Sequence, residues 1–402
     1  METFSSSTRG QMATQTEMLE VIPRQQHLFI GIPRETILQE NRVALVPHSV
    51  ATLVAQGHRV IVETEAGHKA KFSDHDYSEA GAQIVQSPEE VYKADVLLKV
   101  APPTLDEIDF MRPNQVLISP IHLPLLNPEY ITRLQKKRVI SLAMEYIRDD
   151  DTGVYPIVRV MSEIAGTSAI LIAAELLSTA RGGKGVLLGG IAGVPPAKVI
   201  ILGAGVVAEF ASRTAIGLGA EVRIFDNNVY KLMRLQKHVG RQLHTSVINP
   251  HHLREQLITA DVAIGAIHSA HGRTPVVVPE EIVKQMKPGS VIVDVSIDQG
   301  GIFETSQTTS LDKPTFVKHG VIHYGVPNIP SRVARTASDA ISNILTSLLL
   351  KAEAGGILPL ITSHEGLRNG VYTYKGCLTN AHLGERFRLK STNLDLLITS
   401  DF

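Results

Sequence analysis

The sequence predicts an α/β protein with two parallel-sheet domains joined by long helices. Short β-rich runs alternate with helical stretches over the first 150 or so residues, which indicates a parallel sheet covered on both faces. A second series of the same kind opens at Lys198 and ends near Arg332. Long helical patterns start at Ser162 and at Ala334, on either side of this second series.

Composition supports a globular protein and excludes several functional classes. The 402 residues are 44% hydrophobic and 20% charged, close to globular averages. Because 39 Lys+Arg face 40 Asp+Glu, the net charge of −1 predicts no nucleic-acid partner and no attraction to an anionic membrane. The single cysteine, Cys377, excludes an internal disulfide and a thiolate cluster, and without a zinc motif we expect no metal. The apolar stretch 186–208 is broken by two prolines and a lysine, so we expect a cytoplasmic protein without a membrane span.

The first domain is expected to begin near Leu28. Residues 1–26 have no apolar period and no signal-like core, so we expect a flexible extension there. A helix is predicted at residues 47–56, ended by Gly57. Strands are predicted at residues 28–32, 59–62, 96–100, 115–119 and 138–141.

Two long helices are predicted outside the sheets. The first runs from Ser162 to about residue 179 and ends at a Gly-Gly pair. In the second, Thr336 and Asp339 are a plausible N-terminal cap, and the helix should stop at Gly355-Gly356.

A dinucleotide-binding fingerprint opens the second series. The apolar strand Lys198–Leu202 leads directly into Gly203-Ala204-Gly205-Val206-Val207-Ala208 and then into a helix. Gly203 permits a tight turn, Gly205 lets backbone approach a pyrophosphate, and Ala208 keeps the helix close to its strand. Because Val206 begins the helix, its N-terminal end would face the phosphates. The pattern predicts a Rossmann dinucleotide site.

An acidic residue follows at the spacing that such a site needs. The next strand, Glu221–Phe225, ends at Asp226, 21 residues after Gly205. A carboxylate there accepts hydrogen bonds from ribose hydroxyls and repels a 2′-phosphate, so NAD(H) is predicted rather than NADP(H). Lys231 and Arg234 lie close enough to leave some doubt, and Lys231 is counted among the expected cofactor contacts. Strands at 261–266 and 291–295 should complete this sheet.

Four side chains are candidates for substrate chemistry. Arg42 follows the first strand, where its planar fork suits a carboxylate, although an ion pair with a neighbouring acid is the alternative. Lys99 ends a buried strand, so either a substrate contact or a structural ion pair fits it. His122 lies just past the strand at 115–119 and can shuttle a proton. Asp298 follows the strand at 291–295, beside the expected nicotinamide position.

Several segments together resemble one known family. The chain resembles the alanine dehydrogenase/pyridine-nucleotide transhydrogenase α-subunit family, in the family's order from about residue 28 to about 345. The matching segments are Gly31-Ile32-Pro33-Arg34-Glu35, Glu40-Asn41-Arg42-Val43-Ala44, Leu97-Leu98-Lys99-Val100, Met161-Ser162-Glu163-Ile164-Ala165-Gly166, and residues 189–195, 203–208 and 294–301.

The resemblance implies two Rossmann-like domains and an activity. It implies a substrate domain of residues 27–160 plus 332–402, an NAD domain of residues 161–331, and a hexamer. It implies NAD-dependent, reversible oxidative deamination of L-alanine to pyruvate and ammonia. By position, Arg42 and Lys99 would contact the substrate carboxylate and carbonyl, and His122 and Asp298 would move protons. Nucleotide contacts are implied for Ser162, Asp226, Val326 and Asn328.

Two departures from the family lie on the substrate side. The family commonly has Lys-Glu-Pro after Lys-Val, where this chain has Ala101-Pro102-Pro103. A Gly-x-Gly-Ser loop is replaced by Gly67-His68-Lys69-Ala70-Lys71. Three alternatives therefore stay open: a transhydrogenase-type NAD(H)-binding subunit, a dehydrogenase of another amino acid, and a non-catalytic NAD-sensing regulator.

Overall fold

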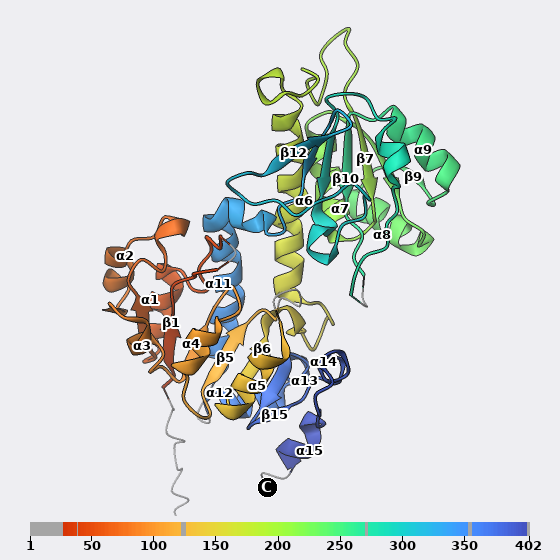
Figure 1. Cartoon of the computed structure of the whole chain (residues 1–402). Coiled ribbons are helices and arrows are strands. Elements are labelled where there is room, and N and C mark those ends of the chain that lie inside the picture. Colours follow the sequence, from red (N-terminus) through yellow and green to blue (C-terminus); the bar gives the residue numbers. More distant parts are fainter. Residues whose placement is uncertain (1–26, 38, 122–125, 270–271, 353–355, 400–402) are drawn as a thin grey trace, which may run out of the picture.

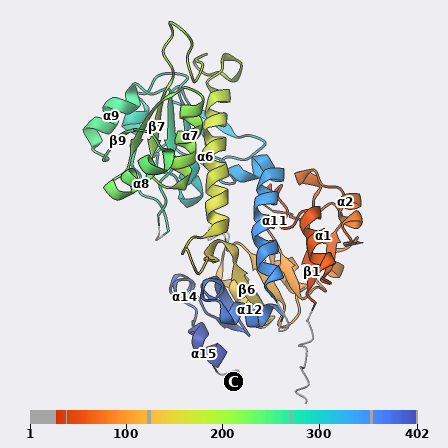
Figure 2. The same ribbon diagram turned by 180° about the vertical axis from the view of Figure 1, so that it is seen from behind.

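The computed structural model describes residues 27–37, 39–121, 126–269, 272–352 and 356–399. These residues form two lobes, each built on a largely parallel sheet covered by helices, so the predicted α/β class is confirmed. Two long helices, α6 (Pro156–Leu176) and α11 (Ala334–Leu350), run side by side between the lobes (Figures 1 and 2). The extension expected at 1–26 lies outside the described residues.

The first sheet has six parallel strands in the doubly wound order β3-β2-β1-β4-β5-β6. Two C-terminal strands extend it beyond β6, and β14 runs antiparallel to both β6 and β15. The strands are β1 (Phe29–Ile32), β2 (Arg59–Glu63), β3 (Gln83–Val85), β4 (Val96–Leu98), β5 (Val116–Ser119), β6 (Ile140–Ala143), β14 (Val371–Tyr374) and β15 (Cys377–Leu378).

The second sheet repeats this order as β9-β8-β7-β10-β11-β13, with β12 antiparallel at its edge. Its strands are β7 (Lys198–Leu202), β8 (Glu221–Phe225), β9 (His244–Ser246), β10 (Val262–Gly265), β11 (Val291–Asp294), β12 (Thr315–Lys318) and β13 (Val321–Tyr324). Because β7 and β10 are adjacent while their chain connections run to opposite sides, the strand order reverses between them. Ligands of such sheets bind at the carboxyl ends of the strands at this reversal.

Helices cover both faces of each sheet because successive strand residues point to opposite sides. Ile32 and Val62 pack with α11, whereas Leu97 and Leu117 pack with helices on the other face. The helices of the first lobe are α1 (Pro47–Ala55), α2 (Asp74–Glu79), α3 (Pro88–Val91), α4 (Leu105–Asp109), α5 (Pro128–Lys136), α12 (Ile357–Ser363), α13 (Glu365–Arg368), α14 (Ala381–Phe387) and α15 (Leu394–Thr399). Those of the second are α7 (Val206–Gly217), α8 (Val229–Val239), α9 (Pro250–Ile258) and α10 (Glu280–Val283).

Helix α6 begins six residues before its predicted start because Pro156 occupies its first turn, where no backbone donor is needed. It is long and apolar enough to cross a membrane by length and composition, with a mean hydropathy of 1.6. In the structure it instead packs against α7, so closely that a Cβ at Gly166 would collide with the Val207 carbonyl. We therefore interpret α6 as a core helix of the lobe junction.

Helix α11 corrects the predicted cap. The helix begins at Ala334, directly after a 3₁₀ turn (Ile329–Val333), and no side chain in the described part of the protein caps it. Thr336 and Asp339 thus lie inside the helix, and the helix ends at Leu350, before the expected Gly355-Gly356 stop.

Candidate functional site

The fingerprint loop between β7 and α7 has the geometry of an anion site. Gly203 has φ 116°, and a Cβ there would collide with the Ala266 carbonyl, so only glycine fits. At Gly205 a Cβ would meet no atom of the described residues within 4 Å. No described side chain caps α7, so the backbone N–H groups that begin at Val206 are available to a ligand. Ala208 is fully buried beneath them, as predicted from its role in helix–strand packing.

Asp226 holds this loop from the end of β8. Its Oδ2 accepts from the Ala204 N–H at 2.8 Å, and its Oδ1 accepts from the Asn228 N–H at 2.8 Å. The carboxylate is half-buried beside the glycine turn, where a ribose would lie next to a bound pyrophosphate. Lys231 is exposed on α8, and its charge adds to burial in lowering the pKa of His268.

The other predicted cofactor contacts differ in their surroundings. Ser162 is half-buried on α6, on the lobe junction. Val326 is buried in the core of the second lobe, so its backbone rather than its side chain is available. Asn328 donates from Nδ2 to Glu40 Oε2 at 2.7 Å and so contacts the first lobe.

Asp298 lies on a 3₁₀ turn (Val295–Gln299) that a buried aspartate anchors. Asp294 accepts from Ser296 N, Ile302 N and Ser306 Oγ at 2.7–3.1 Å. By surface area Asp298 is exposed to solvent, yet the protein packed around it removes much of its hydration. This loss of hydration raises the pKa of Asp298 to about 6. The negative charge of Asp294 also raises it, while a hydrogen bond from the Gln299 backbone lowers it. A carboxyl group with this pKa is suited to proton transfer near neutral pH.

Arg42 lies where the two lobes meet. Its Nε and Nη2 donate to Glu40 Oε1 and Oε2 at 2.8 and 2.6 Å, and its Nη1 contacts Met161 Sδ of α6 at 3.1 Å. Burial opposes ionisation of Glu40, but the charge and hydrogen bonds of Arg42 outweigh it and lower the pKa of Glu40. The ion pair with a neighbouring acid, the alternative for Arg42, is therefore present, but inside the lobe junction rather than on an open surface.

Lys99 forms a buried ion triad. Its Nζ lies 3.3 Å from Glu35 Oε2 and 3.1 Å from Glu107 Oε1, and its side chain is 1% exposed. Burial alone would lower the pKa of Lys99, but the two carboxylates outweigh it and raise that pKa. Of the two alternatives for Lys99, the structural ion pair is the one present. A substrate contact by Lys99 stays a prediction, for which the triad leaves no accessible ammonium.

His122 lies outside the described residues. The residue before it is held firmly, because the Ile121 N–H donates to Glu145 Oε1 at 2.7 Å. The chain thus leaves the carboxyl end of β5 from a fixed point.

Loops from the two lobes meet around Arg42. Gln39 accepts from Leu311 N at 2.7 Å and also bonds to Asp312, while Asn41 N donates to Ser331 Oγ at 2.8 Å. The segment after β1 thereby contacts the segment before β12 and the turn after β13, and β13 is the neighbour of the strand that leads to Asp298. No direct contact between Asp298 and Arg42 is present among the described residues. The sequence did not identify Glu40 as the partner of both Arg42 and Asn328, although its position two residues before Arg42 was a usable signal.

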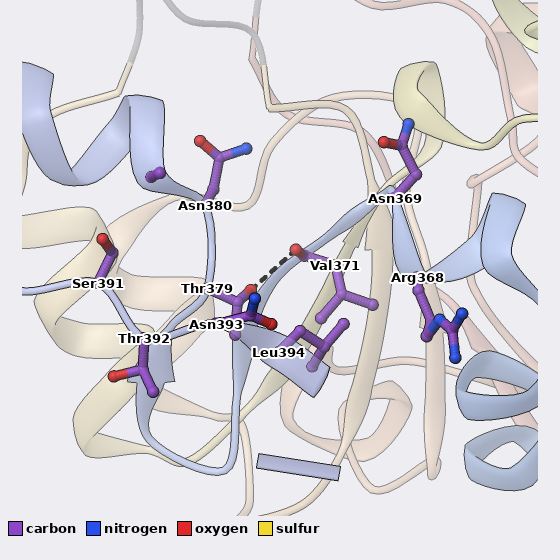
Figure 3. A pocket seen from close by; sticks show the side chains of 10 residues that line it. Arg368, Asn369, Val371, Thr379, Asn380, Ser391, Thr392, Asn393 and Leu394 are labelled. Atoms are coloured by element: carbon purple, nitrogen blue, oxygen red, sulfur yellow. Dashed lines mark hydrogen bonds between the residues drawn. The ribbon is translucent and has the colours of Figure 1, made fainter. Parts of the chain in front are cut away.

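Two cavities lie away from the lobe junction. A cavity of about 380 Å³ is lined by residues of the C-terminal segment, among them Arg368, Thr379 and Asn393 (Figure 3). Thr379 Oγ1 donates to the Val371 carbonyl, so this wall is part of the strand pairing of the C-terminal segment. A second hollow lies along α8, between Met233 and Arg241. Neither contains a predicted site residue, so neither competes with the lobe junction.

Gly205→Val is expected to weaken NADH binding at least tenfold while leaving the melting temperature nearly unchanged. The added side chain would enter the open space over the fingerprint loop and block the backbone N–H groups, whose bonds to a charged group each contribute about 1.5–3 kcal/mol. Titration of NADH fluorescence and a thermal melt check this. Gly203→Val is the control for a folding defect, because its clash with the Ala266 carbonyl must lower the melting temperature. Normal NADH affinity in Gly205→Val would contradict the assigned site.

Comparisons with known proteins cover nearly the whole chain. Two family models match: "Alanine dehydrogenase/PNT, N-terminal domain" over residues 31–165 and "Alanine dehydrogenase/PNT, C-terminal domain" over residues 169–381. The chain is 41% identical over 353 residues to alanine dehydrogenase of Bacillus subtilis (strain 168), covering 88% of this chain and 93% of that one. It is 41% identical over 368 residues to alanine dehydrogenase 2 of Staphylococcus aureus (strain USA300), covering 91% and 98%.

Solved structures agree with these relatives. A structure of an L-alanine dehydrogenase superposes with a TM-score of 0.84 at 39% identity, covering 89% of this chain and 99% of that one. A transhydrogenase from Sinorhizobium meliloti follows with a TM-score of 0.74 at 27% identity, covering 87% and 98%.

Proposed function

The chain belongs to the alanine dehydrogenase/PNT family, and on this premise we propose that it catalyses the NAD-dependent, reversible oxidative deamination of L-alanine to pyruvate and ammonia. The observation that carries the proposal is an open dinucleotide loop together with Arg42 at the lobe junction and a carboxyl group of raised pKa, Asp298, on the turn after β11. Each half of this arrangement supplies one need of the reaction.

The fingerprint loop fits NAD. The open space over Gly205 and the uncapped start of α7 suit a pyrophosphate, and Asp226 is placed for the ribose hydroxyls. The backbone at Val326, with Ser162 and Asn328 on the lobe junction, would bound the nicotinamide side. When bound, NAD supplies the hydride acceptor for the reaction.

The remaining steps fall to this chain's own side chains. Arg42 would hold the substrate carboxylate at the lobe junction, with Glu40 orienting the guanidinium. Asp298, with its pKa of about 6, would accept protons as water adds to the imine carbon, and His122 would exchange protons with the substrate oxygen. This division of roles assigns substrate binding to the first lobe and the cofactor to the second.

We extend the proposal to organisation. Residues 27–160 with 332–402 would form the substrate domain and residues 161–331 the NAD domain, an assignment supported by β14 and β15 joining the first sheet. A cytoplasmic homo-oligomer, a hexamer by resemblance, is proposed with it.

The transhydrogenase-type subunit is the second candidate. The likeness to the Sinorhizobium meliloti transhydrogenase favours it, but the identity of 27% is below the 39–41% shared with alanine dehydrogenases. Hydride exchange between nucleotides also needs neither a carboxylate anchor nor a proton carrier, so it leaves Arg42 and Asp298 without a role.

Oxidation of NADH by the purified protein separates the candidates. We expect absorbance loss only when pyruvate and ammonium are both present, because the nitrogen must enter the product. A dehydrogenase of 2-hydroxy acids needs pyruvate alone, and a transhydrogenase-type subunit needs NADP and a partner. A panel of 2-oxo acids with ammonium then tests the substrate, and a preference for an acid larger than pyruvate would replace alanine as the product.

A further inference from the structure

The two cations that the sequence assigns to the substrate, Arg42 and Lys99, are both paired with acidic side chains in the structure. Lys99 is sequestered between Glu35 and Glu107 and is 1% exposed, so it has no free ammonium for a ligand. Arg42 is paired through two hydrogen bonds with Glu40, whose lowered pKa keeps it ionised. The Arg42–Glu40 pair therefore carries no net charge, and a substrate carboxylate placed on it gains little net electrostatic attraction.

Lys69 supplies a positive charge next to this pair. Its Nζ donates to the backbone carbonyl of Glu40 at 3.2 Å, so Lys69 and Arg42 contact the same residue. Its side chain is exposed, and among the described residues no carboxylate lies within ion-pair distance of it. Of the cations at this junction, Lys69 thus differs from Arg42 and Lys99 in having its charge uncompensated by the described acids.

The turn that carries Lys69 is built rather than loose. Lys69 is the middle residue of a 3₁₀ turn (His68–Ala70), between exposed His68 and buried Ala70. Gly67 lets the turn close on the core, because a Cβ there would lie 2.6 Å from the Tyr77 ring. Tyr77 is itself buried and donates to the Leu45 carbonyl at 2.7 Å. The backbone at Lys69 is therefore held in place beside Glu40.

We propose that Lys69 is a second substrate-binding cation, whose ammonium acts with Arg42 on the carboxylate of a 2-oxo acid. That the acid is pyruvate rests on the proposed function. That a cation at this position binds a carboxylate does not depend on it. Lys69 stands in the segment where this chain departs from the glycine-rich loop of its family, so the cation is a feature of this chain's own site.

Replacing Lys69 tests this role against a matched neighbour. Lys71 is also exposed, two residues away, and its backbone contacts His68 and Arg335, while its ammonium has no partner among the described residues. Pyruvate affinity of the NADH-saturated protein is measured by calorimetry, and KM and kcat in the pyruvate–ammonium assay, for Lys69→Met, Lys71→Met and Lys69→Arg. We expect Lys69→Met to weaken pyruvate binding and raise its KM by about 10- to 100-fold, the loss of one hydrogen bond to a charged group. We expect kcat to change by less than about threefold, Lys71→Met to match the wild type, and Lys69→Arg to restore most of the affinity.

The outcomes separate this inference from the proposed function. Unchanged pyruvate binding in Lys69→Met, or an equal loss in Lys71→Met, would overturn the role of Lys69 while leaving the reaction intact. Wild-type protein that binds pyruvate but shows no alanine chemistry would overturn the reaction, and the calorimetric comparison would still decide Lys69. Wild-type protein that binds no pyruvate would overturn both.

Discussion

Asp298→Asn is expected to lower the turnover of L-alanine by about 10²- to 10⁴-fold, the usual contribution of a general acid–base group. The amide has nearly the same shape as the carboxyl group but cannot take up a proton. NADH affinity should stay nearly intact, because Asp298 lies on the turn after β11 rather than on the fingerprint loop. Steady-state rates with L-alanine and NADH titration together check both statements.

The pH profile makes this prediction specific. In the wild type, a base with a pKa of about 6 must be ionised, so kcat/KM for L-alanine should fall about tenfold per pH unit below pH 6 and level off above it. The residual rate of Asp298→Asn should lack this ionisation. If Asp298→Asn keeps the fall in rate below pH 6, or turns over at the wild-type rate, Asp298 does not transfer protons in the reaction.

Arg42→Met is expected to lower the free energy of unfolding by about 3–5 kcal/mol and also to weaken substrate binding. It leaves Glu40, which is 1% exposed, as a buried carboxylate whose side-chain donors among the described residues are Asn328 and Ser331. Urea unfolding at pH 7 measures the loss. Because Arg42 lowers the pKa of Glu40 from its ordinary 4.5, the pair stabilises the wild type above that pH and less as the pH falls. The deficit of the variant should therefore shrink below about pH 4.5.

The double variant Glu40→Gln/Arg42→Met separates folding from binding. Removing the charge along with its partner should recover most of the lost stability, since no uncompensated ion remains. Pyruvate affinity should stay low in both variants, because neither retains the guanidinium. Recovery of pyruvate affinity together with stability would show that Arg42 acts only through the fold.

The sequence predicted the strands that are strongly apolar and missed those that are not. The bounds of β7 and β8 agree with the prediction, because each strand is an apolar run rich in β-branched residues with a clear end. β7 ends at the fingerprint and β8 ends at Asp226. β9 is short and mostly exposed, so no apolar pattern marks it. β14 pairs with β6, more than 200 residues earlier, and only the assembled sheet shows that pairing.

The sequence predicted the residues of the fingerprint turn and where they lie, but not which acidic side chains pair with the cations of the site. The fingerprint residues form the expected turn because a glycine pattern encodes backbone geometry locally. Lys99 illustrates the limit. Its position at the end of an apolar strand predicts that it is buried, but its partners Glu35 and Glu107 come from two other segments. Which cation remains free for a ligand is decided by such long-range pairs, and a single sequence does not reveal them.

Absorbance at 340 nm, with purified protein, NAD⁺ and L-alanine, tests the central claim most directly. The proposed reaction predicts NADH formation that depends on L-alanine, releases pyruvate and ammonia in equal amounts, and needs no second protein. A protein that binds NADH at the fingerprint loop yet forms no NADH from L-alanine would contradict it.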